Sequence, residues 1–182
     1  MPNSTTMLYA IGAFVLGVIV AIGAERLVFS HKDQRDAMET FGVFQGWRLN
    51  CPPRTMKNGT CVMQQALARK GSSAAIAELN IATRDGKDYL TVVAPLGVLV
   101  PPGLKVSIGN GTDKMISYKT CVQMGCVATV PIDQAMADAM SNNAGIRITV
   151  FAPDERTVPL NFSLGGYKDA LAARTVDMAA RK

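Results

Sequence analysis

The longest apolar stretch of this chain runs from Met7 to Ala24 and contains no charged residue. A helix rises about 1.5 Å per residue, so this stretch spans nearly the ~30 Å of hydrocarbon in a bilayer. The residues on either side of it, at 5–6 and 27–29, extend the apolar length. The pattern therefore predicts a single N-terminal transmembrane helix within residues 1–29.

A cleaved signal peptide is the alternative interpretation of this stretch, with Ala21-Ile22-Gly23 as a passable cleavage site. Signal peptides usually begin with a basic segment, but residues 1–6 carry no Lys or Arg. The apolar run is also longer than the hydrophobic core of a typical signal peptide. We therefore expect the helix to remain on the chain as an anchor.

Small residues recur on one face of the predicted membrane helix. Ala13, Gly17 and Ala21 are spaced four residues apart, so they share one face of a helix. Small side chains at such positions let a second helix approach closely. They indicate a packing face for a partner helix, although small residues are common enough in membrane helices for the pattern to arise without one.

Residues 30–42 are polar and charged, and we interpret them as a juxtamembrane spacer. After them, short apolar segments alternate with turn signals such as Arg84-Asp85-Gly86. This alternation places one globular domain at 43–176 and a short C-terminal tail at 177–182. The predicted strands are Phe44–Asn50, Cys61–Leu67, Ala74–Thr83, Tyr89–Ala94, Lys105–Ile108, Met115–Lys119, Cys126–Val130, Ile146–Phe151 and Val158–Leu164.

Two short helices are expected among the strands. Residues 132–140 (IDQAMADAM) follow a proline and have an acidic first turn, which suits a helix N-terminus. Residues 167–176 follow the pair Gly165-Gly166. Many short strands at this spacing predict a mainly β fold, an antiparallel β-sandwich with one or two short helices. In that fold we interpret the single tryptophan, Trp47, as a core anchor rather than an exposed binding aromatic.

The four cysteines fall into two local pairs, Cys51 with Cys61 and Cys121 with Cys126. Structural zinc sites prefer two Cys pairs with two to four residues between the cysteines, whereas the gaps here hold nine and four residues. Catalytic dithiols usually have Cys-x-x-Cys, which neither pair has. Turn signals lie inside the first pair, and Gly125 permits a tight reversal inside the second. We therefore predict two disulfides, each worth about 2 to 3 kcal/mol in the chain-entropy model.

Disulfides persist in oxidising compartments, so the predicted pairs place the domain outside the cytoplasm. The flank after the membrane helix carries Arg26, Lys32 and Arg35, and the positive-inside rule would place it in the cytoplasm. We give the cysteines more weight than this weak charge bias. The expected arrangement is a single-pass inner-membrane protein with its C-terminal domain in the periplasm.

The composition points away from catalysis. The only histidine, His31, lies in the spacer, so the domain has no histidine for a Ser-His-Asp or Cys-His centre. Calcium-loop and phosphate-loop motifs are also absent from the sequence. The net charge of +5 comes from scattered Lys and Arg, which suits a solvated surface or an anionic envelope partner. We predict no enzyme activity, no cofactor, no metal site and no nucleic-acid partner.

Four stretches together resemble the invasion-associated locus B family of alphaproteobacterial envelope proteins. They are GWRLNC (46–51), APLGVLVPPGLKVSIGNG (94–111), YKTCVQMGCVATVPID (118–133) and VPLNFSLGGYKDAL (158–171). The resemblance implies an immunoglobulin-like β-sandwich exposed in the periplasm or envelope, and it brings no catalytic residues. The family is named for an association with host-cell invasion.

The chain departs from the family pattern at its N-terminus, where we expect a membrane anchor in place of a cleavable signal peptide. The expected function is a non-enzymatic interaction protein of this family that binds through its sandwich and its membrane helix. One such role is that of an accessory subunit of an inner-membrane complex. The alternative is a secreted or surface-exposed invasion or adhesion factor that binds a host or envelope component.

Overall fold

The computed structural model describes residues 38–56, 59–71, 74–109 and 113–181. The chain divides into two units, and the second, Glu39–Lys182, contains every element described below. No helix in the described residues has the length and apolar character that a membrane span requires. The predicted membrane helix at 1–29, with its packing face of Ala13, Gly17 and Ala21, lies outside the described residues.

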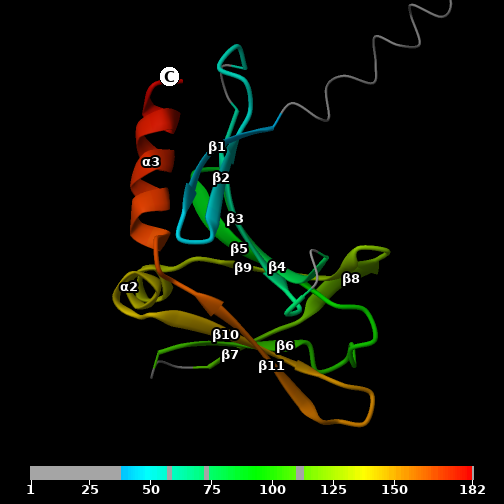
Figure 1. The fold of residues 1–182 in the computed structure, drawn as a ribbon. Coiled ribbons are helices and arrows are strands. Elements are labelled where there is room, and N and C mark those ends of the chain that lie inside the picture. Colours follow the sequence, from blue (N-terminus) through cyan, green and yellow to red (C-terminus); the bar gives the residue numbers. More distant parts are fainter. Residues whose placement is uncertain (1–37, 57–58, 72–73, 110–112, 182) are drawn as a thin grey trace, which may run out of the picture. The chain divides into compact units, whose positions relative to one another are not determined.

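Eleven strands and two helices make up the described part of the domain (Figure 1). One sheet contains, in spatial order, β1 (Glu39–Phe44), β2 (Trp47–Cys51), β3 (Val62–Ala68), β4 (Ala75–Arg84), β5 (Lys87–Ala94), β9 (Gly125–Pro131) and β8 (Tyr118–Val122). The second contains β11 (Thr157–Ser163), β10 (Gly145–Phe151), β6 (Leu104–Ile108) and β7 (Lys114–Ile116). The helices are α2 (Gln134–Asn142) and α3 (Tyr167–Ala179). Every strand pairing is antiparallel.

The helix α3 and the four-stranded sheet cover different parts of the inner face of the seven-stranded sheet. The helix α3 packs on β1, β2 and β3, while β11 contacts β3 and β7 contacts β9. Figure 1 shows α3 standing beside β1 and β2, with β10, β6 and β11 in a separate layer. This division leaves a junction where the two helices meet the ends of β4, β5 and β9.

The core forms from alternate residues of the strands, because successive side chains of a strand point to opposite faces of a sheet. In β4, for example, Ala77, Leu79 and Ile81 are buried while the residues between them are partly exposed. Trp47 is fully buried, and its Nε1 donates a hydrogen bond to the backbone oxygen of Ser163, 3.1 Å away. Trp47 is therefore a core anchor that ties β2 to the end of β11.

The structure confirms a mainly β fold of two packed antiparallel sheets with two helices. Seven of the nine predicted strands correspond to β3, β4, β5, β6, β9, β10 and β11 with small shifts at their ends. Both predicted helices are present, at Gln134–Asn142 and Tyr167–Ala179. Apolar alternation and turn residues are local signals, and they therefore locate these elements well.

One predicted strand, Phe44–Asn50, is wrong at its start because a hairpin turn lies within it. β1 ends at Phe44, and β2 begins at Trp47. Gln45 and Gly46 between them have positive φ angles of 46° and 100°, the combination that a two-residue hairpin turn requires. Gln-Gly is a weaker hairpin signal than Asn-Gly or Asp-Gly, so the sequence pattern hides this turn.

The predicted strand Met115–Lys119 is divided between the two sheets. β7 ends at Ile116 in the four-stranded sheet, and β8 begins at Tyr118 in the seven-stranded sheet. The break falls at Ser117, where the chain crosses from one layer to the other. Such a crossing depends on the strands available for pairing on each side, so local alternation does not reveal it.

The domain extends beyond both predicted limits. Residues 39–42, which we assigned to the spacer, belong to β1 and pair with β2. At the other end, the side chains of Asp177 and Arg181 are only 1% and 6% exposed. The segment predicted as a C-terminal tail, 177–182, therefore contributes buried residues to the domain. Charged residues give no apolar signal, which explains why the sequence assigns them to a tail.

Candidate functional site

Two disulfides join the cysteines in the pairs expected from the sequence. Cys51 at the end of β2 is bonded to Cys61 just before β3, and Cys121 of β8 is bonded to Cys126 of β9. The first pair is buried, whereas Cys121 is exposed. Each bond closes a short chain reversal, and the described residues contain no free thiol. The disulfides are therefore structural staples, as their spacing predicts.

The hairpin between β8 and β9 depends on Gly125. Its φ angle is 143°, and a Cβ atom at this position would lie 2.3 Å from the backbone oxygen of Ala94. Glycine adopts this backbone region without a steric penalty and leaves room for the neighbouring strand. Gly125 therefore lets Cys126 stand opposite Ala94 in the β5–β9 pairing.

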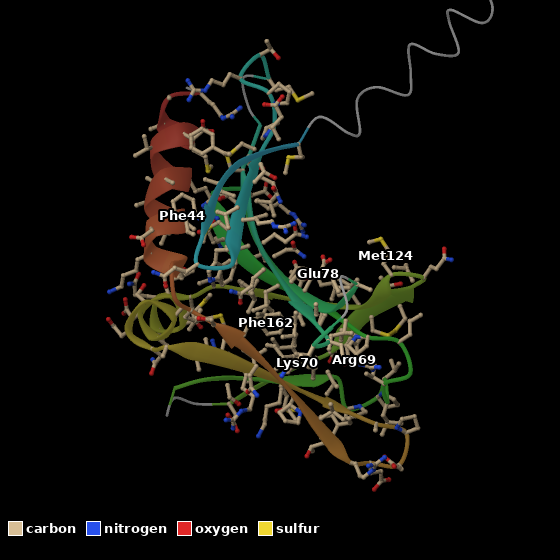
Figure 2. The ribbon with its side chains drawn as sticks, viewed as in Figure 1. Phe44, Arg69, Lys70, Glu78, Met124 and Phe162 are labelled. Atoms are coloured by element: carbon tan, nitrogen blue, oxygen red, sulfur yellow. A yellow bond between two sulfur atoms is a disulfide. The ribbon has the colours of Figure 1, made fainter. Side chains whose placement is uncertain are left out.

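The end of this hairpin exposes apolar side chains. Met124 is 83% exposed and Val122 is 47% exposed. Figure 2 shows Met124 projecting from the hairpin, on the side of the domain away from Phe44 and α3. Exposed apolar residues that lie together are a common feature of contact surfaces.

A carboxylate lies against the buried disulfide. Asp177 Oδ2 is 3.1 Å from Cys61 Sγ, and together with Cys51 these groups place their potential ligand atoms within 4.8 Å of one another. Both sulfurs are used in the S–S bond, so neither is the thiolate that a zinc ion requires. Asp177 instead accepts a hydrogen bond from Arg181. We therefore interpret this cluster as structural rather than as a metal centre.

The helix α3 carries charged residues on the face that it packs against the sheet. Its buried residues are Tyr167, Ala170, Arg174 and Asp177, which recur at the three- and four-residue spacing of a core-facing stripe. The side chain of Arg174 is only 5% exposed, and its Nη2 donates a hydrogen bond to Asp88 Oδ2. Buried charges are tolerated when they are paired in this way. Ion pairs therefore hold α3 against the sheet in places where apolar residues would be expected.

Asp88 connects several elements at the start of β5. Its carboxylate accepts hydrogen bonds from Arg174 of α3 and, at 2.6 Å, from Thr83 Oγ1 of β4. Its backbone oxygen accepts a hydrogen bond from the backbone N–H of Ile132, 2.8 Å away, in the link between β9 and α2. Asp88 thus fixes the relative positions of both helices and the β4–β5 hairpin.

A groove of about 800 Å³ lies at this junction. Both helices, the β4–β5 hairpin and the end of β9 contribute to its walls. Its apolar lining comes from Pro131, Ile132, Ala137, Leu171, Met178 and Ala179, and its polar lining from Thr83, Lys87, Asp88, Asp133, Gln134, Tyr167, Arg174 and Thr175. Because it combines volume, apolar walls and convergent polar groups, this groove is the candidate binding site of the domain.

Arg174 has unused hydrogen-bonding capacity at the groove. Its Nη2 is paired with Asp88, whereas Nε and Nη1 are buried and have no hydrogen-bond partner among the described residues. Nearly all buried polar groups in native proteins are hydrogen-bonded, so such exceptions point to strain, to an ordered water or to a functional role. A buried donor without an acceptor costs about 1 to 3 kcal/mol.

Tyr167 brings a neutral hydroxyl to the same groove. Its ring packs against Trp47, with ring centroids 5.8 Å apart and planes tilted by 58°. Burial raises the pKa of the Tyr167 hydroxyl, Arg174 acts to lower it, and Asp88 acts to raise it. The net shift is upward, so at neutral pH this hydroxyl can both donate and accept a hydrogen bond.

The groove is lined by charges of both signs, Lys87 and Arg174 against Asp88 and Asp133. Lys87 is exposed and makes no ion pair with another described residue. Asp133, at the N-terminus of α2, is neutralised by Lys114 Nζ at 2.5 Å. The hydrogen bond from Lys114, followed by one from the backbone N–H of Met136, holds the pKa of Asp133 below its ordinary value. The Asp133 carboxylate caps the start of α2 and so offsets the positive end of that helix dipole.

None of the groove residues is among the site residues predicted from the sequence. Asp88 and Arg174 lie 86 positions apart, and no local pattern links them. One signal was available: Arg174 and Asp177 stand where the apolar stripe that begins with Tyr167 and Ala170 would continue. Charged residues at core-facing positions of a helix need buried partners, which only the folded chain identifies.

Residues 47–175 match the family model of the invasion associated locus B (IalB) protein, which is well over half of the chain. The matched segment contains both disulfides. The chain belongs to the IalB family. Asp88 and Arg174 lie inside the IalB segment, whereas Asp177 and Arg181 lie beyond its end.

Relatives of this IalB domain support the assignment. Invasion protein B homologs of Brucella abortus strain 2308 and of biovar 1 strain 9-941 are each 29% identical to it over 134 residues, which cover 71% of this chain and 75% of theirs. The crystal structure of invasion associated protein B from Bartonella henselae has a TM-score of 0.65 at 19% identity. That match covers 74% of this chain and 95% of the Bartonella chain, and it shows a shared fold.

Proposed function

We propose that this IalB-family chain is a non-enzymatic interaction protein, anchored in the inner membrane with its β-sandwich in the periplasm. In this arrangement the sandwich and the membrane helix both contact partners, as in an accessory subunit of an inner-membrane complex. The observation that carries the proposal is the pair of disulfides within the family domain, because disulfides of this kind persist outside the cytoplasm.

The chemistry of the domain supports a binding role rather than catalysis. All four cysteines are used in disulfides, so no thiol remains as a nucleophile. The single histidine, His31, lies outside the matched family segment. Ser163 Oγ accepts a hydrogen bond from the backbone N–H of Gly165 at 3.0 Å, a common role for a serine in a turn.

The apolar segment Met7–Ala24 supports the anchoring part of the proposal, because its length and lack of charge suit a bilayer span. The small residues at 13, 17 and 21 offer a face for a partner helix. A partner that spans the same membrane would contact the chain in both compartments. This arrangement favours the accessory-subunit role.

Purification of the full chain in mild detergent tests the proposal. Recovery of a membrane complex in fixed stoichiometry supports the accessory role, whereas a chain that purifies alone from the membrane contradicts it. Mass spectrometry of the same material locates the N-terminus. Peptides from residues upstream of Ala24 support the anchor, and a mature terminus near Ala24 or Glu25 would exclude it.

A second candidate is a secreted or surface-exposed factor that binds a host or envelope component. The observation in its favour is that both Brucella relatives are named as invasion protein B homologs. Fractionation separates the two candidates. The proposed function places the chain in the inner-membrane fraction, and the second candidate places it in the medium or on the cell surface.

A further inference from the structure

We propose that the groove between α2, α3 and the β4–β5 hairpin binds the C-terminal carboxylate of a partner polypeptide whose last residues are apolar. This inference names a partner feature for the interaction role and so rests on the proposed function. The groove lies wholly within the described domain, so its binding can be measured separately from membrane anchoring.

Arg174 supplies the anion-binding group. Its side chain is 5% exposed and lines the groove, yet Nε and Nη1 have no hydrogen-bond partner among the described residues. A guanidinium matches a carboxylate with two parallel hydrogen bonds. Asp88 takes a hydrogen bond from Nη2 alone, so Nε and Nη1 remain as donors for a carboxylate.

The surroundings of Arg174 add further positive potential. Lys87 on the groove rim has no ion-pair partner among the described side chains. The N-terminus of α2 also borders the groove, but the Asp133 carboxylate already caps it through the backbone N–H of Met136. Lys114 neutralises Asp133, so that carboxylate opposes an anionic ligand only weakly.

The walls of the groove indicate what carries the carboxylate. Ile132, Leu171 and Met178 present apolar surface close to Arg174, which suits an apolar last side chain. Thr83, Gln134 and Thr175 lie along the same groove, and their side-chain oxygens can accept hydrogen bonds from a peptide backbone. Each of these side chains already donates a hydrogen bond within the chain, but its oxygen remains free to accept one from a peptide N–H, which a free fatty acid does not have, so the mixed lining favours a polypeptide terminus.

Fluorescence anisotropy with the full-length protein in detergent tests this directly. The probe is a short dye-labelled peptide that ends in two leucines, prepared with a free C-terminal carboxylate and, as a matched control, with a C-terminal amide. We expect the carboxylate form to bind at least about tenfold more tightly, because hydrogen bonds to a charged group are lost in the amide. Equal affinity of the two peptides would overturn the proposal.

Point variants test whether the peptide binds in the groove. Thr175→Trp fills the groove from an exposed position and should abolish binding, whereas Val176→Trp, at a neighbouring position outside the groove lining, should leave it unchanged. Lys87→Gln should weaken binding about two- to fivefold, as expected for one exposed charge. Binding that persists in Thr175→Trp would contradict the assigned site.

The role of the buried Arg174 is tested with a substitution, after the folding of that variant has been checked. Arg174→Gln should weaken binding of the carboxylate peptide at least about tenfold and remove its preference over the amide peptide. If Arg174→Gln fails to fold, the Thr175 and Lys87 variants decide the question. Dye-labelled decanoate serves as an alternative probe, and binding of decanoate without any peptide binding would assign the groove to fatty acids instead. If neither peptide binds, the carboxylate site is wrong. Co-purification with a membrane complex, which tests the proposed function, does not depend on that result.

Discussion

Arg174 near the middle of α3 donates a hydrogen bond to Asp88 at the start of β5, although the two residues lie 86 positions apart. The arginine side chain is 5% exposed and the aspartate side chain 30% exposed. This pair joins the C-terminal helix to the seven-stranded sheet beside the candidate groove. It therefore links the stability of the domain to the shape of the candidate groove.

Asp88→Ala should destabilise the domain by about 2 kcal/mol, because it leaves the buried Arg174 without its charged partner. The double variant Asp88→Ala with Arg174→Met should recover part of this loss, since no buried charge then remains unpaired. Urea denaturation measures both. Lys168→Gln on the exposed side of α3 serves as a control that should change little. Arg174→Met alone completes the cycle, and a loss in the double variant equal to the sum of the two single losses would show that the pair is not coupled.

The two disulfides should differ in their resistance to reduction. Cys121 is exposed, whereas Cys51 and Cys61 are 3% and 0% exposed. Thiol exchange requires access of the attacking thiolate to a sulfur. Mild reductant followed by alkylation should therefore label Cys121 and Cys126 first. Mass spectrometric peptide mapping reads the order, and simultaneous labelling of all four cysteines in folded protein would contradict it. A bond between Cys51 and Cys121 in unreduced protein would contradict the pairing itself.

Gly125→Ala should destabilise the domain. Forcing a side chain into a rare backbone region usually costs about 1 to 3 kcal/mol. The steric conflict with Ala94, at 2.3 Å, adds to this cost. Gly71→Ala is the matched control, because Gly71 also has positive φ but no heavy atom lies within 4 Å of the added Cβ. Thermal unfolding compares the two. Equal effects would mean that the close approach to β5 is unimportant.

Tyr118 should ionise only at strongly alkaline pH. Burial raises the pKa of its hydroxyl to about 12 from 10.0, so the folded state holds this proton more tightly than the unfolded state. The stabilisation is fully present below pH 10 and is lost as the pH rises towards 12. Absorbance titration should show late ionisation in the parent protein, and Tyr118→Phe should reduce its amplitude by one tyrosine, since burial also raises the pKa of Tyr167. An unchanged amplitude in Tyr118→Phe would contradict the prediction.

Gly17→Leu should weaken association with a membrane partner while leaving the β domain folded. A leucine on the face of Ala13, Gly17 and Ala21 would hold a partner helix away and remove close packing. Membrane insertion should be unchanged, because leucine is favourable in hydrocarbon. Val18→Leu, on a different face, is the volume control. Unchanged partner recovery with Gly17→Leu would show that the helix serves only as a tether.

The sequence by itself determined most of the fold. Apolar alternation located seven of the nine predicted strands, and helix signals located α2 and α3, because side-chain periodicity and turn residues are local properties of the chain. The short spacing of the cysteines likewise identified both disulfides, since a loop of a few residues leaves each cysteine one nearby partner. The IalB motifs were readable for the same reason, as each lies in one short stretch.

Only the tertiary structure decided where the candidate site lies. Asp88 is an ordinary turn-proximal aspartate in the sequence, and Arg174 is one charged residue in a helix of mixed composition. Their pairing depends on the sheet and α3 being brought together by contacts between distant segments. The hairpin turn at Gln45 and Gly46 and the sheet change at Ser117 were hidden for the same physical reason. In each case the conformation depends on distant chain segments that local sequence patterns do not specify.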